Sequence, residues 1–360
     1  MKRLCLLLCC LPMLCSCSFI TLERQIYPIC MSIDHTEDGK YLIGIQAPRA
    51  SAGSGAASYE IITATGTTFD ETLRTLSAST PYPLNFSQIR LCLIGYPLAA
   101  VTHLRALLRT VLELPTMRPN CYVSIAMGSA VEVMQRQQPD FGMRLSTHLS
   151  LMLDRMRTEN LLPDSTLSVC VRDLSDGRSD PLIGVSAVNP HLLPEEEKAQ
   201  QQPSGSPKPA DETPAFALGE PWSDALLPEG ISAGLVPHTS QNPVEYLGAA
   251  ALSHGRVSGV LTADQVQLVL RLQKEARMKV AREGEKVQLQ IWLKEGSALA
   301  QNVDAIYGLM EVLQALRSDP LLFGCMCSMG FGTDEEWMQY DFSGKYHAAQ
   351  VVVRLTRIYE

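Results

Sequence analysis

Short apolar runs alternate with apolar residues at helical spacing through the first half of the chain. Residues 89–95 form a nearly continuous apolar run, which is typical of a strand buried on both faces. Residues 121–127 form a second such run. The residues at helical spacing between and after these runs are Val101, Leu104, Leu108, Val111 and Leu112, and then Leu145, Leu149, Met152, Leu153 and Met156. Strands that alternate with helices predict an α/β domain.

The segments before this alternation predict three strands and a capped helix. The predicted strands cover residues 26–34, 40–47 and 59–64. Asp38 and Gly39 lie between the first two, and an Asp-Gly pair between two β-rich runs indicates a hairpin. Thr68 is followed three residues later by Glu71, which is the spacing of a capping box. We therefore expect a helix to begin after Thr68 and to run to about residue 77.

The second half resumes after a long polar stretch. Residues 189–243 are rich in Pro, Gln and Glu, and such a composition cannot bury enough apolar area to fold alone. Thr262 and Gln265 have capping-box spacing and predict a helix behind a hairpin at 246–261. Further predicted elements are a strand at 287–293, a helix at 303–316 and a strand at 350–358.

These patterns predict an α/β (mixed α+β) fold with several domains, mixed sheets and flanking helices. The expected organisation is a signal peptide at 1–16, one or more N-terminal α/β domains at 17–188, a Pro/Gln-rich linker or exposed loop at 189–243 and a C-terminal α+β domain at 244–360.

The first seventeen residues predict export and lipidation. Lys2 and Arg3 precede an apolar run of about eleven residues, which is typical of a secretory signal and too short to cross a bilayer. Ser16 stands directly before Cys17, and Leu14 stands three residues before it, which fits a bacterial lipoprotein signal. A diacylglyceryl group on the Cys17 thiol would hold the protein stably at a membrane. The alternative is an ordinary secreted protein with a Cys-rich signal, or cleavage at another site.

The charge balance limits the partners of the body. The formal net charge is −8, and removal of Lys2 and Arg3 with the signal brings it to about −10 (−8 minus 2). This balance argues against nucleic acid as a partner, and against a body held to anionic lipid by its overall charge. No later apolar stretch reaches the length of a membrane span. We therefore expect the lipid to provide the anchor.

Cysteine usage indicates packing rather than metal chemistry. The cysteines outside the signal region are Cys30, Cys92, Cys121, Cys170, Cys325 and Cys327. Most lie in apolar runs, where a free thiol behaves as a small apolar group. Cys325 and Cys327 have no second pair or His at a spacing that would suit zinc.

The chain carries no recognisable catalytic motif. A Gly-x-Ser-x-Gly elbow, a phosphate-binding loop and a His-Glu-x-x-His motif are all missing from the sequence. The acidic run at 334–336 predicts a solvated loop more readily than a cation site. A hydrolase would need Ser, His and Asp close in space, for example with Ser129 or Ser253 as nucleophile. We predict a chain that is not an enzyme and needs no cofactor or metal.

Several short motifs follow one another along the chain in a characteristic order. They are the lipobox at Cys17, then Leu22-Glu23-Arg24, Ile33-Asp34, residues 64–71, Leu93-Ile94-Gly95, residues 117–128, the hairpin at 247–261, residues 319–324 and Trp337. In this order the chain resembles the Ger(x)C family, the lipoprotein C subunits of spore germinant receptors. It departs from the family pattern at Ser18, where a Trp often follows the lipidated Cys. The linker is also long, and the third domain looks shortened between Leu293 and Val303.

The resemblance implies a three-domain lipoprotein on the outer face of the inner spore membrane. It would assemble with two polytopic membrane subunits, A and B, into a receptor for small nutrients, with no catalytic residues of its own. The expected contact surfaces are the hairpin at 246–261 and the linker. The alternative is a stand-alone extracytoplasmic solute-binding lipoprotein, which would capture a small ligand in a cleft between domains.

Overall fold

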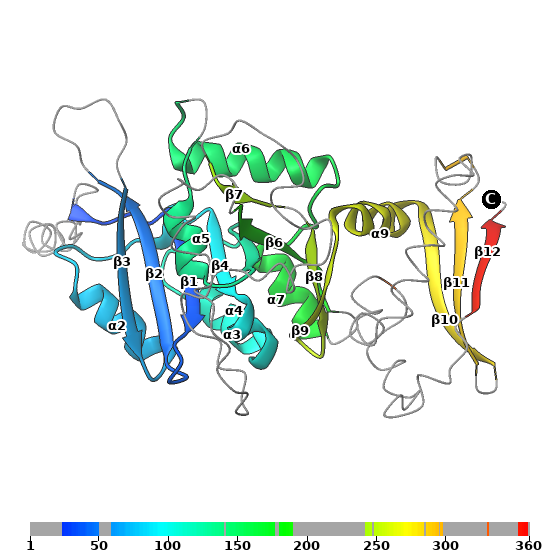
Figure 1. Cartoon of the computed structure of the whole chain (residues 1–360), viewed down its shortest axis with the longest axis horizontal. Helices are drawn as coiled ribbons and strands as arrows, with labels where there is room; N and C mark the ends of the chain where they lie inside the picture. Colours follow the sequence, from blue (N-terminus) through cyan, green and yellow to red (C-terminus); the bar gives the residue numbers. More distant parts are fainter. Residues whose placement is uncertain are drawn as a thin grey trace, which may run out of the picture.

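A computed structural model of the chain describes residues 24–49, 59–139, 142–176, 180–189, 242–246, 248–283, 286–294, 296–297, 330 and 352–358. Nine strands form one large mixed sheet, and three more form a small second sheet (Figure 1). The large sheet contains β1 (Cys30–His35), β2 (Tyr41–Pro48), β3 (Tyr59–Gly66), β4 (Leu91–Gly95), β5 (Tyr122–Ala126), β6 (Ile183–Val188), β7 (Val244–Glu245), β8 (Ala249–Ser253) and β9 (Arg256–Leu261). The second contains β10 (Ala276–Glu283), β11 (Lys286–Lys294) and β12 (Val352–Ile358).

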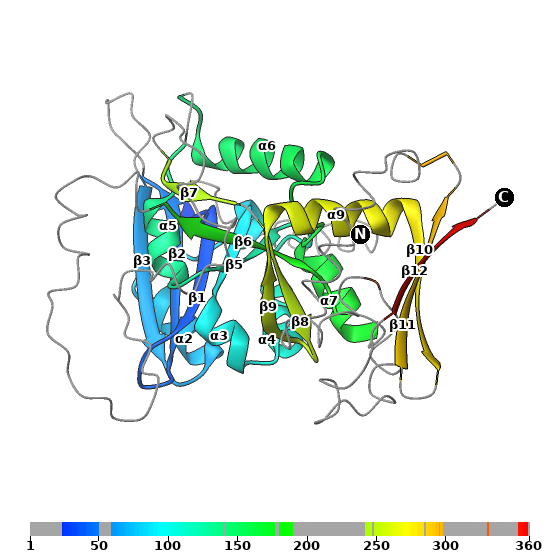
Figure 2. The ribbon, with the colours of Figure 1, turned by 45° about the vertical axis from the view of Figure 1, so that its right-hand side comes forward.

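Helices cover both faces of the large sheet. They are α2 (Phe69–Ala78), α3 (Tyr96–Val101), α4 (Leu104–Leu112), α5 (Ala130–Arg136), α6 (Leu145–Thr158) and α7 (Leu167–Asp176), with a short 3₁₀ turn at Phe86–Gln88. A further helix, α9 (Ala263–Glu275), leads directly from β9 into β10 and so connects the two sheets (Figure 2). The predicted mixed α/β fold class is confirmed.

The large sheet has a parallel centre and antiparallel edges. Its order is β3-β2-β1-β4-β5-β6-β8-β9, with β7 paired to β6. Strands β1, β4, β5 and β6 run parallel, whereas β2 and β3 on one side, and β8 and β9 on the other, pair antiparallel. The central strands are buried along nearly their whole length, as the continuous apolar runs predict for strands covered on both faces.

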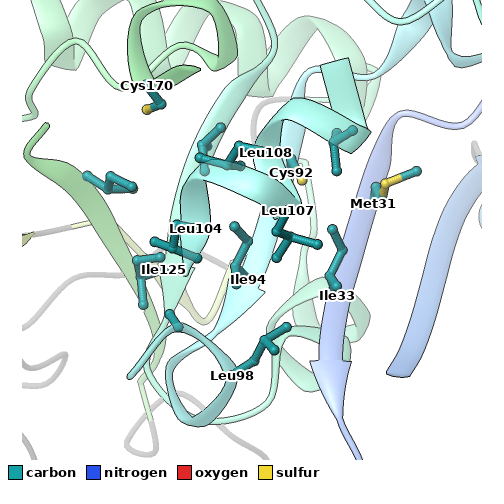
Figure 3. Close-up of a cluster of buried hydrophobic side chains, with 14 of the residues drawn as sticks. Met31, Ile33, Cys92, Ile94, Leu98, Leu104, Leu107, Leu108, Ile125 and Cys170 are labelled. Atoms are coloured by element: carbon teal, nitrogen blue, oxygen red, sulfur yellow. The ribbon is translucent and has the colours of Figure 1, made fainter. Parts of the chain in front are cut away.

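Alternate side chains of these strands fill two separate cores. On one face, Ile33, Ile94 and Ile125 pack against α3, α4 and α7, where Leu98, Leu104 and Leu108 are fully buried (Figure 3). On the other face, Leu93 and Ala126 pack against α5 and α6. The result is a three-layer arrangement in which the carboxyl ends of the parallel strands lie at one edge of the sheet.

The two predicted helix caps form. Thr68 Oγ1 accepts a hydrogen bond from the Glu71 backbone N–H at 3.2 Å. The Glu71 carboxylate accepts from Thr67 N–H rather than from Thr68 N–H. At α9 both bonds of the capping box are present between Thr262 and Gln265. Each cap satisfies backbone donors that would otherwise lack partners, which explains where the helices begin.

Some elements differ from the sequence predictions. The helix expected through Val101 to Leu112 is broken, because Leu104 N–H donates to the Gly255 carbonyl at 2.8 Å instead of continuing the helical ladder. Val101 is consequently 62 % exposed and not part of the core. Four elements were not predicted, namely α5, α7, β6 and β10. The hairpin expected at 246–261 is also wrong at its start, since β7 ends at Glu245 and the first strand of the hairpin, β8, begins at Ala249.

The division into domains stays a prediction. Strands β7 to β9 fall in the part expected to form the C-terminal domain, yet β7 and β8 both hydrogen-bond to β6. The predictions that lie outside the described residues are the signal peptide with Cys17, most of the linker, the helix at 303–316, Cys325, Cys327, the acidic run at 334–336, residues 319–324 and Trp337. Among the helices in the described part of the chain, none combines the length and the apolar character that crossing a membrane requires.

Candidate functional site

A buried carboxylate lies where three parallel strands end. Asp34, at the end of β1, is 3 % exposed. Its Oδ1 accepts a hydrogen bond from Ala130 N–H at 2.9 Å, and its Oδ2 accepts from Val131 N–H at 2.9 Å. The Ser129 hydroxyl donates to Oδ2 at 3.2 Å. Asp34 thus holds the first turn of α5, which follows β5, from a strand almost a hundred residues earlier in the chain.

Gly95, at the end of β4, makes room for this carboxylate. A Cβ atom at Gly95 would lie 2.0 Å from Asp34 Oδ1 and 3.3 Å from the Gly128 carbonyl oxygen. No side chain fits at that distance, so glycine is required by space rather than by backbone conformation. The same cluster of contacts therefore joins the ends of β1, β4 and β5. We call Asp34, Gly95 and Ser129 the carboxylate junction.

Burial raises the pKa of the Asp34 carboxyl above its ordinary value. The hydrogen bonds from Ala130, Val131 and Ser129 act in the opposite direction, because they favour the ionised form. Asp34 accepts three hydrogen bonds from the N-terminus of α5, so the carboxylate is engaged in holding the fold. This arrangement is typical of a structural cap rather than of a general base open to substrate.

Ser129, one of the serines considered for a hydrolase, is the N-cap of α5. Its Oγ accepts from Glu132 N–H at 3.3 Å while its hydroxyl donates to Asp34. Within the described part of the chain, no hydrogen bond joins Ser129 to a histidine; His35 instead packs edge-on against Tyr41, with ring centroids 4.8 Å apart. The side chain of Ser253 is outside the described residues. Ser129 is therefore occupied in capping.

The turn of the predicted contact hairpin packs against the residues that precede β6 and α4. His254 and Gly255 have φ values of 51° and 72°, so the β8–β9 turn uses the left-handed region. Gly255 N–H donates to Asp180 Oδ2 at 3.0 Å, and the His103 ring lies against Gly255. The segment Ala249–Leu252 is fully buried. If a partner binds this hairpin, it can reach mainly the exposed side chains of His254 and Arg256.

Four of the six cysteines outside the signal lie in the described part, and all four are buried free thiols. They are Cys30, Cys92, Cys121 and Cys170. Burial raises the pKa of each thiol, to about 12 at Cys92. This confirms packing for these four. A search of the described residues found no group of three or more His, Cys, Asp or Glu side chains placed to hold a metal ion.

In the sequence, the parts of the carboxylate junction belong to separate motifs. Asp34 and Gly95 end the motifs at 33–34 and 93–95, and Ser129 directly follows the motif at 117–128. A usable signal was present, because each segment ends an apolar run that the pattern predicts as a strand. The carboxyl ends of parallel strands meet at one edge of a sheet, so polar and glycine residues at those ends are expected to be neighbours.

A family model matches the part of the chain that forms β1 to β6. Residues 19–187 match the model of the spore germination protein N-terminal domain, a segment that contains β1 to β6 and the whole carboxylate junction. Among curated proteins, none matches the chain. A solved structure described as "Crystal Structure of the GerBC protein" is similar with a TM-score of 0.37 and 12 % sequence identity, over 91 % of this chain and 97 % of that chain.

Proposed function

Because the chain belongs to the Ger(x)C family, whose members are C subunits of spore germinant receptors, we propose that it acts as a non-catalytic subunit of a nutrient receptor. The observation that carries the proposal is the family match over residues 19–187, which spans the central strands of the large sheet and the helices on both of its faces. The proposed role is to assemble with two polytopic membrane subunits, A and B, and so to support the response of the spore to nutrients.

We also propose that Cys17 is lipidated and anchors the chain on the outer face of the inner spore membrane. The support is the sequence around Cys17, where Ser16 precedes the thiol and Leu14 stands three residues before it. Two acyl chains bury enough CH₂ groups for stable anchoring, at about 0.8 kcal/mol each. The acidic body would then stay at the membrane through its lipid, close to its partner subunits.

A scaffold role is consistent with the chemistry of the described residues. Asp34, the most buried carboxylate among them, holds α5, and the four described thiols are free and buried in the core. Ser129 is engaged in a helix cap. These groups stabilise a large sheet, and stable folded surface is what a subunit needs in order to position partners.

Co-purification from spore membranes tests the proposed role. The chain is tagged after Glu360 and extracted in mild detergent, with Cys17→Ala as the matched control. Recovery of polytopic A- and B-type subunits with the wild-type chain, and their loss with Cys17→Ala, is the expected result. Recovery of the chain alone in the membrane fraction would contradict the role in a receptor and would favour a stand-alone solute-binding lipoprotein, for which saturable ligand binding is the next test.

A further inference from the structure

One face of the second sheet carries a small set of exposed basic side chains around a tryptophan. Arg277 and Lys279 lie two residues apart on β10, so their side chains point to the same face. Arg277 is in register with Trp292 of β11, and Lys279 is in register with Gln290. Residues opposite one another in an antiparallel pair share a face. We call Arg277, Lys279, Gln290 and Trp292 the basic face.

On the opposite face of the same sheet, Ile291 and Leu293 of β11 are buried, and Ala276 and Met278 of β10 are half-buried. Met278 is in register with Ile291, and Ala276 is in register with Leu293. Ile291 is completely buried and Leu293 is 3 % exposed. Arg277 and Lys279, by contrast, are exposed, and Trp292 is partly buried. The alternation of polar and apolar residues therefore turns the basic face away from the core and toward the surroundings.

The charges of the basic face are not neutralised within the described part of the chain. Neither Arg277 nor Lys279 forms an ion pair with any residue there, whereas other exposed arginines do, for example Arg109 with Glu113 at 2.9 Å. Lys294, at the end of β11, adds an exposed charge at the edge of the same sheet. These residues place a local concentration of positive charge on a chain of net charge −8, and such a surface attracts an anionic partner.

We propose that the basic face contacts the headgroups of an anionic phospholipid surface. Charge complementarity is one reason, since lysine and arginine close to an anionic membrane are attracted by its surface potential. Trp292 is the second, because an indole ring has an apolar body and a polar N–H and is enriched where membrane meets water. An acidic protein segment would neutralise the charges but would leave the partly exposed indole beside Arg277 without a contact. This contact would act locally and does not depend on lipidation of Cys17.

Fluorescence of Trp292 tests the contact directly. The full chain carries Trp222→Phe and Trp337→Phe, so that Trp292 is the remaining tryptophan. It is mixed with vesicles of phosphatidylcholine alone or with phosphatidylglycerol added, each containing a lipid with a quencher in the headgroup region. We expect quenching of Trp292 with phosphatidylglycerol, weak quenching without it, and loss of quenching at 1 M salt, where the screening length falls to about 3 Å.

Two double variants make the test specific. Arg277→Gln with Lys279→Gln should weaken the contact about 25-fold, at about fivefold for each basic residue near the membrane. Arg105→Gln with Arg118→Gln removes the same charge from exposed sites on the large-sheet part of the chain and should leave the contact unchanged. Equal quenching in both kinds of vesicle, or equal loss in the two double variants, would overturn the proposal. Protection of Trp292 by a polyglutamate peptide but not by phosphatidylglycerol would also overturn it, and would assign the face to an acidic protein.

Discussion

Gly95 and Asp34 fit together because Gly95 has no side chain: a Cβ there would lie 2.0 Å from Asp34 Oδ1. The carboxylate occupies that space in order to reach the N–H groups of Ala130 and Val131. Two residues on neighbouring parallel strands are thus matched in shape, and together they fix where α5 begins.

Gly95→Ala should destabilise the protein by about 1–3 kcal/mol, as overpacking of a filled site does. The Ala Cβ would push the carboxylate away from α5. The free energy of unfolding in urea measures the loss. The matched control is Gly95→Ala in an Asp34→Ala background, where the clash with the carboxylate is gone and the added cost should be smaller. Equal costs in the two backgrounds would show that the clash is not with Asp34.

Asp34→Asn tests the charge state of the junction. Because burial raises the pKa of Asp34 in the folded protein, the folded state holds a proton that the unfolded state loses. The stabilisation from this group is present below the unfolded pKa and is lost as pH rises through the folded pKa. The advantage of wild type over Asp34→Asn in unfolding free energy should therefore shrink as pH rises from about 4. An advantage that grows with pH would mean that the hydrogen bonds outweigh the burial.

Gly255→Ala should cost more than Gly39→Ala. Both glycines have nearly the same backbone conformation, with φ of 72° and 73°, so the strain of placing Ala there is matched. A Cβ at Gly255 would lie 2.4 Å from His103 Cε1, whereas a Cβ at Gly39 meets nothing within 4 Å. The free energy of unfolding in urea is measured for both variants. The difference between them reports the packing of the hairpin turn against His103, the residue before α4. Equal destabilisation would show that His103 simply moves aside.

The four buried cysteines should resist thiol reagents in the folded protein. Burial raises their pKa values, so the reactive thiolate is scarce near neutral pH, and the core excludes the reagent. Maleimide labelling followed by peptide mass spectrometry should find Cys30, Cys92, Cys121 and Cys170 unmodified in buffer and modified in urea. Rapid modification of any of the four in the native protein would contradict the described packing.

Two of the central strands and the two capped helices could be predicted from local patterns. β4 and β5 are short, continuous apolar runs, and Thr68 and Thr262 stand at the correct spacing for their caps. β10 carried a readable signal, because Arg277 and Lys279 alternate with Met278 in period two.

Non-local contacts explain what the sequence could not predict. The break between α3 and α4 depends on the Gly255 carbonyl, which lies about 150 residues along the chain from Leu104. The carboxylate junction depends on three strand ends that meet only once the sheet has formed. The pairing of β8 with β6 likewise joins strands on the two sides of the long polar stretch, and composition carries no information on which strands pair.

The most direct test of the central claim is nutrient-triggered germination. Spores in which this chain is the sole C subunit are compared with the same spores after its deletion, by loss of optical density on addition of nutrients and, separately, of a non-nutrient trigger. A receptor subunit predicts that deletion abolishes the nutrient response, that the non-nutrient response persists, and that the wild-type chain restores the first. An unchanged nutrient response after deletion would contradict the proposed function.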